Sequence, residues 1–208
     1  MEAKIKLKVQ GLTNSQVKSG AYALILSEDG ARRIPIIMGI SEAQSIAIAL
    51  EDIRPPRPLT HDLFTRFSKA FKIRLREVLI CRFDDGIYYS EMVFSDGVNE
   101  VRIDSRTSDA VAIALRMKCN IYTYESIMQK CGIVLDENNI TKTSDTLFPE
   151  NPNTDNMDEM AKLREWLQLL QKSEIEERMA KVIEEENYEL AKIYKEELQR
   201  REEEEGSL

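Results

Sequence analysis

The sequence predicts an α+β domain made of two similar halves, followed by an all-α segment. Short apolar runs are separated by Asp-Gly pairs, an alanine-rich run with helical periodicity follows them twice, and the end of the chain carries apolar residues at helical spacing only. We expect duplicated βββα halves that form a mixed or antiparallel sheet packed with helices, plus an all-α C-terminal helical hairpin.

Three strands are predicted in the first half. Apolar residues alternate with lysines over residues 4–9, and apolar runs follow at 21–26 and 32–37. Between the last two lies Asp29-Gly30, which suits a tight hairpin because glycine accepts positive φ. The second and third strands are therefore expected to pair.

Two helices are predicted next. Ser41 and Gln44 have the spacing of a capping box, so a helix begins there and runs to Leu50. Thr60 is expected to cap the second helix. Four apolar residues of that helix fall on one face, namely Leu63, Phe67, Ala70 and Phe71.

The second half repeats this order of elements. Its strands are expected at 74–83, 87–94 and 98–103. Residues 104–109 are expected to open its helix, which covers 110–117. A strand at 120–124 and a helix that ends at Cys131 follow. Ser41-Glu42-Ala43 and Ser108-Asp109-Ala110 match at the two helix starts, with an offset of 108 − 41 = 67 residues. The front domain is therefore predicted to be a duplication with pseudo-twofold symmetry.

Three regions are expected along the 208 residues. The α+β domain covers 1–136, and residues 137–157, rich in Asn and Pro, form a linker. Residues 158–208 form helices, the first with an apolar seam and the last two separated near Asn187. The seam consists of Met160, Leu163, Leu167 and Leu170.

Charge differs between the front and the end of the chain. Residues 1–140 hold 19 Lys+Arg and 18 Asp+Glu, a net charge of 19 − 18 = +1. Residues 141–208 hold 10 Lys+Arg and 19 Asp+Glu, a net charge of 10 − 19 = −9. Together they give the net charge of −8 for the whole chain. Nucleic-acid binding draws on basic residues, so a pI of about 5.0 for the whole chain argues against it. The near-neutral charge of the front part weakens this objection and does not remove it.

The chain is expected to be cytoplasmic and to have no membrane contact. No run approaches the ~18 apolar residues of a membrane span. The three cysteines, Cys81, Cys119 and Cys131, form no CxxC pair and are expected to be reduced thiols.

Acidic residues gather at the predicted helix starts. Glu42, Asp62 and Asp109 fall in first turns, where each is already explained by stabilising the helix dipole by about 0.3–1 kcal/mol. His61, the single histidine, is likewise more often structural than catalytic.

The grouping of these residues with arginines favours a phosphodiester site. Helix N-termini and arginines bind phosphate, carboxylates hold Mg²⁺ or Mn²⁺, and the ion would activate a water with His61 as proton carrier. We expect His61, Asp62, Glu42 and Asp109 to be catalytic, Arg57, Thr60, Arg106 and Ser108 to bind substrate, and Asp62, Asp104 and Asp109 to bind the metal. Glycine-rich phosphate loops, HExxH and GxSxG are all missing from the sequence.

The motifs of the front domain resemble the bifunctional nuclease family over roughly residues 5–136. They are residues 34–39, Glu42-Ala43, Arg57-Pro58-Leu59-Thr60-His61-Asp62-Leu63 and Asp104-Ser105-Arg106-Thr107-Ser108-Asp109-Ala110. The resemblance implies DNase and RNase activity. Thr107 stands where the family usually has proline, which should loosen the helix start slightly.

The end of the chain resembles the UVR motif, a helical hairpin that binds protein partners. The similar residues are 184–191 with Lys195, Glu196 and Leu198, while Tyr194 and Lys195 replace the usual leucine and arginine. The resemblance implies a protein partner bound through residues 175–201. A generic acidic hairpin is the other interpretation of this segment.

Two functions are compatible with these patterns. The first is a metal-dependent nuclease acting on DNA or RNA, with a C-terminal protein-interaction hairpin. The alternative is a non-catalytic ligand-binding or adaptor module that acts through protein contacts. A homo-oligomer formed through sheet edges or tail helices is expected under both.

Overall fold

A computed structural model describes residues 2–14, 21–134 and 157–206. The chain forms two compact units, which are the described parts of Met1–Asp52 with Pro58–Thr143 and of Ile53–Arg57 with Ser144–Leu208. The predicted linker, residues 137–157, lies outside the described residues except for its last one. Its boundaries stay a prediction.

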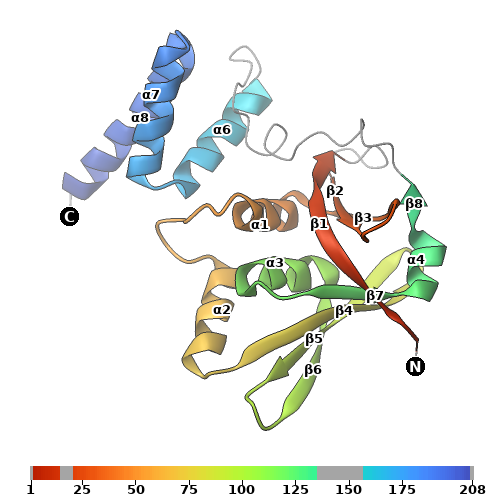
Figure 1. Cartoon of the computed structure of the whole chain (residues 1–208). Helices are drawn as coiled ribbons and strands as arrows, with labels where there is room; N and C mark the ends of the chain where they lie inside the picture. The colour runs from red at the N-terminus through yellow and green to blue at the C-terminus, as the bar shows by residue number, and fades with distance from the viewer. Residues whose placement is uncertain (1, 15–20, 135–156, 207–208) are drawn as a thin grey trace. The chain divides into compact units, whose positions relative to one another are not determined.

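The first unit is built on one eight-stranded sheet with the strand order β6-β5-β4-β7-β1-β2-β3-β8 (Figure 1). The strands are β1 (Lys4–Asn14), β2 (Tyr22–Ser27), β3 (Arg32–Met38), β4 (Arg74–Asp84), β5 (Ile87–Ser95), β6 (Glu100–Arg106), β7 (Ile121–Tyr124) and β8 (Ile133–Val134). β4 pairs with β7 in parallel, and every other pairing of the described strands is antiparallel. The predicted mixed sheet is confirmed.

Both hairpins of the predicted strand pairs form, but only one has the expected turn. Asp85 (φ 48°) and Gly86 (φ 78°) connect β4 to β5 with positive φ, as a tight hairpin requires. Gly30 does not have positive φ, so the tight turn predicted at Asp29-Gly30 is wrong although β2 and β3 do pair.

Four helices accompany the described sheet. They are α1 (Ile40–Leu50), α2 (Thr60–Ala70), α3 (Thr107–Met117) and α4 (Glu125–Cys131). α1 packs on α3 through alanines that are fully buried, and α2 packs on α3. Small side chains let the first two helices approach closely, so their N-termini lie near each other.

The predicted starts of the helices are wrong in detail. α1 is preceded by Gly39 and α3 by Arg106, and neither has a side-chain cap, so Ser41 makes no capping box. Thr60 is the first residue of α2 and not its cap. Instead, the backbone N–H of Leu59 donates to Asp62 Oδ2 at 3.0 Å. The residues predicted to open α3 continue strand β6 as far as Arg106.

The duplication is visible in the order and length of the elements. Each half contains three consecutive antiparallel strands, β1-β2-β3 or β4-β5-β6, followed by a helix of 11 residues. Ile40 and Thr107 begin the two helices, again 107 − 40 = 67 residues apart. β7 lies between the two sets of strands and interrupts the symmetry.

The apolar face predicted for α2 is exposed and not buried. Leu63, Phe67 and Phe71 are 61%, 55% and 64% exposed, whereas Thr65 and Ser68 are buried. The Thr65 hydroxyl donates to the backbone oxygen of His61 at 2.9 Å, which satisfies its polar group inside the helix layer.

The second unit contains three described helices, α6 (Met157–Leu169), α7 (Lys172–Glu184) and α8 (Tyr188–Gly206). The predicted break near Asn187 is confirmed, and the Asn187 side chain accepts a hydrogen bond from Leu190 N at 3.2 Å. Leu163, Trp166, Leu167 and Leu170 are buried with Ile175 and Tyr194. Among the residues that the structure describes, no helix has the length and apolarity to cross a membrane.

Candidate functional site

A pocket of about 430 Å³ lies where α1 and α3 begin. Gly39 and Glu42 line it from α1, Arg106 and Ser108 from the start of α3, and the β4–β5 hairpin closes another side. The first N–H groups of a helix have no partner within the helix and carry partial positive charge. Two such helix starts facing one pocket favour an anion there.

Arg106 connects two acidic residues at the pocket. Its Nη1 donates to Glu42 Oε1 at 2.9 Å, its Nε to Asp109 Oδ2 at 2.7 Å and its Nη2 to Asp109 Oδ1 at 3.1 Å. These hydrogen bonds raise the pKa of Arg106, and the hydrogen bonds to Asp109 have the largest effect. The arginine side chain is nevertheless 67% exposed, so its outer edge faces solvent.

His61 extends this network toward the interior. Its Nε2 lies 3.2 Å from Asp109 Oδ1 and its Nδ1 lies 2.7 Å from Ser45 Oγ. A carboxylate only accepts hydrogen bonds, so Nε2 carries a proton, and Nδ1 shares a hydrogen bond with the Ser45 hydroxyl. Both ring nitrogens are engaged, and His61 therefore holds Asp109 in place.

The pKa of Asp109 reflects these contacts. Burial acts to raise the pKa, but the hydrogen bonds from Arg106 and His61 outweigh burial and the pKa lies below its ordinary value. Asp109 is therefore ionised at neutral pH and keeps the guanidinium of Arg106 oriented toward Glu42.

Gly39 makes room for the Glu42 carboxylate. A Cβ added at position 39 would lie 2.8 Å from Glu42 Oε2, a distance that real Cβ atoms essentially never show. Glu42 thus folds back over the start of its own helix while its other oxygen binds Arg106. Of the four predicted carboxylates, Glu42 is the one that lines the pocket.

Asp62 belongs to a different ion pair. Its Oδ1 accepts from Arg116 Nε at 2.6 Å, and Arg116 Nη1 also donates to the backbone oxygens of Ser45 and Ala112 at 3.0 and 3.1 Å. The arginine side chain is only 8% exposed. Arg116 on α3 thus links Asp62 on α2 to the backbone of α1. These contacts hold the three helices together, which is a structural role.

The remaining predicted residues do not line the pocket. Asp104 is exposed on β6 across from Glu91, and Thr60 is exposed at the start of α2. Arg57 is exposed in a segment that belongs to the other unit. Asp62, Asp104 and Asp109 are not grouped: among the described residues, no three His, Cys, Asp or Glu side chains are arranged to hold a metal ion.

Two aromatic rings also line the pocket. Phe83 and Tyr88 pack at 4.5 Å between ring centroids. Burial and a hydrogen bond with Cys131 raise the pKa of Tyr88, which therefore stays protonated. A planar ring of a ligand could stack here while an anionic group contacts Arg106.

Thr107 connects Tyr88 to α3. Its hydroxyl donates to the backbone oxygen of Tyr88 at 3.2 Å and lies 2.7 Å from Ser90 Oγ. A proline at this position would lack these hydrogen bonds. Whether the threonine loosens the helix start stays a prediction.

The sequence patterns did not identify Ser45 and Arg116. Ser45 follows Glu42 by three residues and Arg116 follows Asp109 by seven, spacings that place each pair on one helix face. This spacing is visible in the sequence, but it does not show that Ser45 contacts His61 or that Arg116 contacts Asp62.

Comparisons with known proteins give three findings. Residues 24–136 match the family model described as the bifunctional nuclease domain. An uncharacterized protein of Mycobacterium tuberculosis is 33% identical over 132 residues, which cover 64% of this chain and 79% of that protein. Bifunctional nuclease 1 of Oryza sativa subsp. japonica is 29% identical over 117 residues, covering 54% of this chain and 35% of the rice protein.

Proposed function

The chain belongs to the bifunctional nuclease domain family, and from this we propose that it is a nuclease that hydrolyses phosphodiester bonds of DNA or RNA at the Glu42–Arg106 pocket. One observation carries the proposal: two helix starts and an exposed arginine face the same pocket, beside a carboxylate. Helix N-termini and an arginine bind phosphate, and a carboxylate beside them can act as a base.

Arg106 is the proposed phosphate ligand. Two of its edges are held by Asp109 and Glu42, so the guanidinium is already oriented before substrate binds. The first-turn N–H groups of α3 and the Ser108 hydroxyl supply further donors. Preorganised donors of this kind stabilise the charge that develops on the phosphoryl oxygens.

Glu42 is the proposed general base. A water oxygen attacks phosphorus, its proton passes to Glu42, and the leaving oxygen takes a proton from solvent as the P–O bond breaks. His61 and Asp109 act by positioning Arg106, because neither ring nitrogen of His61 is free to reach a substrate.

Dependence on Mg²⁺ or Mn²⁺ stays a prediction. The carboxylates expected to bind the ion are divided between two arginines and an exposed strand, so the described residues do not fit such a site. Cleavage measured with added Mg²⁺, with Mn²⁺ and with a chelator tests the dependence directly.

The adaptor function is the second candidate. The two helix starts and the exposed edge of Arg106 are also suited to hold a phosphate-bearing ligand without hydrolysis. Residues 175–201 would then carry the regulatory contact with a protein partner through the UVR-like hairpin. The cytoplasmic location is likewise part of the proposal.

The first test replaces Glu42 by glutamine. We expect Glu42→Gln to lower cleavage of labelled DNA and RNA about 10²- to 10⁴-fold, the usual contribution of a general base, with little change in substrate binding. The matched control is Glu91→Gln, since Glu91 also accepts from an arginine, Arg102, at 3.2 Å but lies outside the pocket.

Two results would contradict the proposed mechanism. Equal cleavage by both variants would remove Glu42 from the reaction and point to a contaminating nuclease. If the wild-type protein cleaves neither DNA nor RNA under any metal condition, the adaptor function replaces the nuclease.

A further inference from the structure

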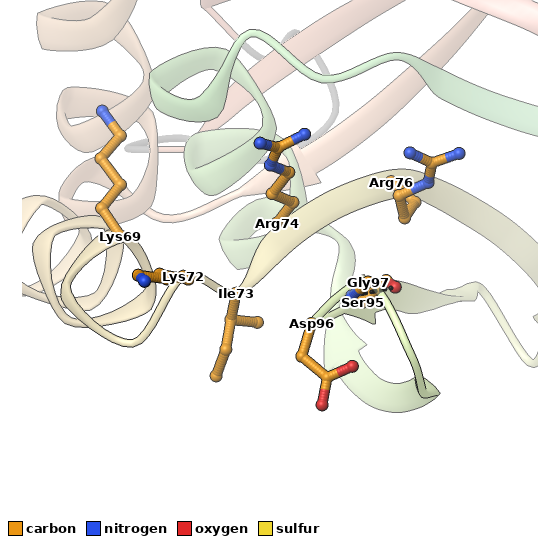
Figure 2. A pocket seen from close by; sticks show the side chains of 8 residues that line it. All are labelled: Lys69, Lys72, Ile73, Arg74, Arg76, Ser95, Asp96 and Gly97. Atoms are coloured by element: carbon orange, nitrogen blue, oxygen red, sulfur yellow. Dashed lines mark hydrogen bonds between the residues drawn. The ribbon is translucent and has the colours of Figure 1, made fainter.

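A second pocket, of about 530 Å³, is lined by four basic side chains. Lys69 and Lys72 come from the end of α2 and the residues after it, and Arg74 and Arg76 from the first residues of β4. Figure 2 shows the charged ends of Lys69, Arg74 and Arg76 pointing to the same side of the ribbon. The turn at Ser95–Gly97 forms the other wall.

None of these four cations is neutralised within the described residues, where their side chains form no ion pair or hydrogen bond. Asp96 is the acidic residue that lines the pocket, and its carboxylate accepts from Val98 N and Asn99 N at 2.8 and 2.7 Å. In Figure 2 its side chain points away from the arginines. The pocket therefore has an excess of positive charge in a chain whose net charge is −8.

Most other arginines of this unit form an ion pair with a carboxylate. Arg32, Arg102, Arg106 and Arg116 each contact a carboxylate within 3.2 Å. Lys69 has a structural explanation, because a cation in the last turn stabilises the helix dipole. Arg74 and Arg76 have none. Both are exposed, and Arg76 lies where the register of β4 with β5 shifts between Leu75 and Glu77. Figure 2 shows both guanidinium groups on the same side of the ribbon, where like charges repel.

We propose that this second pocket binds the phosphodiester backbone of the nucleic acid on which the protein acts. An extended row of cations suits a polyanion, and Arg74 and Arg76, roughly 6.6 Å apart along the strand, can contact successive phosphates. The pocket offers few uncharged donors that could read a base, so binding is independent of sequence.

The proposal adds an anchoring site to the proposed nuclease pocket and takes its ligand class from that function. β4 begins at the second pocket and ends beside the first, since Phe83 and the turn after it line the first. Its 11 residues span roughly 33 Å at about 3.3 Å per residue. A nucleic acid that contacts both pockets therefore needs about ten base pairs at 3.4 Å each.

The test measures binding separately from cleavage. Fluorescence anisotropy is recorded for the full chain carrying Glu42→Gln, with a labelled DNA duplex and a labelled single-stranded RNA, each of about 20 base pairs or nucleotides. Arg74→Gln and Arg76→Gln are then added together. The control adds Lys192→Gln and Lys195→Gln instead, which remove the same charge from exposed positions of α8.

We expect the arginine variant to bind about tenfold more weakly near 0.1 M salt, and the control to bind like its parent. The slope of log K against log salt should fall by about 1.8 for the duplex, or about 1.4 for the single strand, since two phosphate contacts are lost. Thermal unfolding of both variants verifies that they are folded, which is expected because the substituted side chains are exposed.

Equal affinities and slopes for the arginine variant and the control would overturn the proposal, as would a parent protein that binds neither probe. If wild-type protein cleaves nucleic acid and the arginine substitutions leave the affinity unchanged, the proposed nuclease function stands and the anchoring site does not. If the arginine variant loses binding but the wild-type protein does not cleave nucleic acid, the anchoring site stands and the proposed nuclease function does not.

Discussion

Arg106 bridges two carboxylates at equivalent positions of the duplicated halves. Glu42 and Asp109 are 109 − 42 = 67 residues apart, the same offset as the starts of α1 and α3. Packing of these two helices brings the equivalent positions together, and the arginine at the start of the second helix donates hydrogen bonds to both. The first pocket is thus a product of the duplication, with different roles for its two acidic residues.

Asp62 was expected to be catalytic, and its contacts indicate a structural role. We predict that Asp62→Asn lowers the free energy of unfolding by about 2–3 kcal/mol, because Arg116 is then left buried without its carboxylate partner. Nuclease activity of the folded fraction should remain. Chemical denaturation and the cleavage assay measure the two effects.

Asp104→Asn is the control for this prediction, since Asp104 is exposed and forms no ion pair with a described residue; it should change stability by less than about 0.5 kcal/mol. An Asp62→Asn protein that is as stable as wild type and inactive would restore the catalytic role.

At the scale of elements, α2 and β6 leave apolar surface uncovered. Phe67 lies beside the exposed Val101 and Ile103 in a further pocket between the helix and the strand. β6 is also an edge of the sheet, since it pairs only with β5 among the described strands. Unpaired edges with apolar residues are the usual route to association through a sheet.

The predicted homo-oligomer is therefore best tested at β6. Antiparallel pairing of two copies about Ile103 would place Arg102 of one copy opposite Asp104 of the other, and Glu100 opposite Arg106. We expect a concentration-dependent dimer in sedimentation experiments. Ile103→Lys should dissociate it, because two like charges would then meet at the symmetry axis.

Val98→Lys adds the same charge in the turn outside β6, where Val98 is 90% exposed, and should leave the dimer intact. A wild-type protein that stays monomeric at all concentrations, or equal dissociation by both variants, would rule out this edge.

At the scale of the whole molecule, the chain combines two units that each have a core. The first buries the inner residues of its sheet and the alanines of α1 and α3, whereas the second buries Trp166, Leu167 and Tyr194. The excess of acidic residues that gives the chain its negative charge falls in residues 141–208, whereas residues 1–140, which include the domain proposed to bind nucleic acid, are near-neutral.

We predict that deletion of residues 157–208 leaves the sheet domain folded and able to cleave nucleic acid, since its strands and α1 to α4 are complete without them. Circular dichroism should show one cooperative unfolding transition, and the cleavage rate should stay within about threefold of wild type. Binding of the protein partner should be lost. A truncated domain that unfolds or loses cleavage would show that the tail is part of the catalytic unit.

The order of the elements, the duplication and the family could all be predicted from the sequence. These properties depend on local signals: strand alternation, alanine-rich helical runs, turn residues and motifs read in order along the chain. The same local signals failed for α2, where the apolar face is exposed, because a helix period shows that a face exists but not what covers it.

The pairing of each carboxylate with its arginine depends on the packing of the helices. Arg106 reaches Glu42 across 64 residues, and Arg116 reaches Asp62 across 54. Arg116, which no sequence motif indicated, pairs with Asp62, and Asp62 does not line the pocket that Glu42 lines. The physical reason is that these pairs form where α1, α2 and α3 pack together, and the packing of helices that are distant in sequence is not encoded in any one of them.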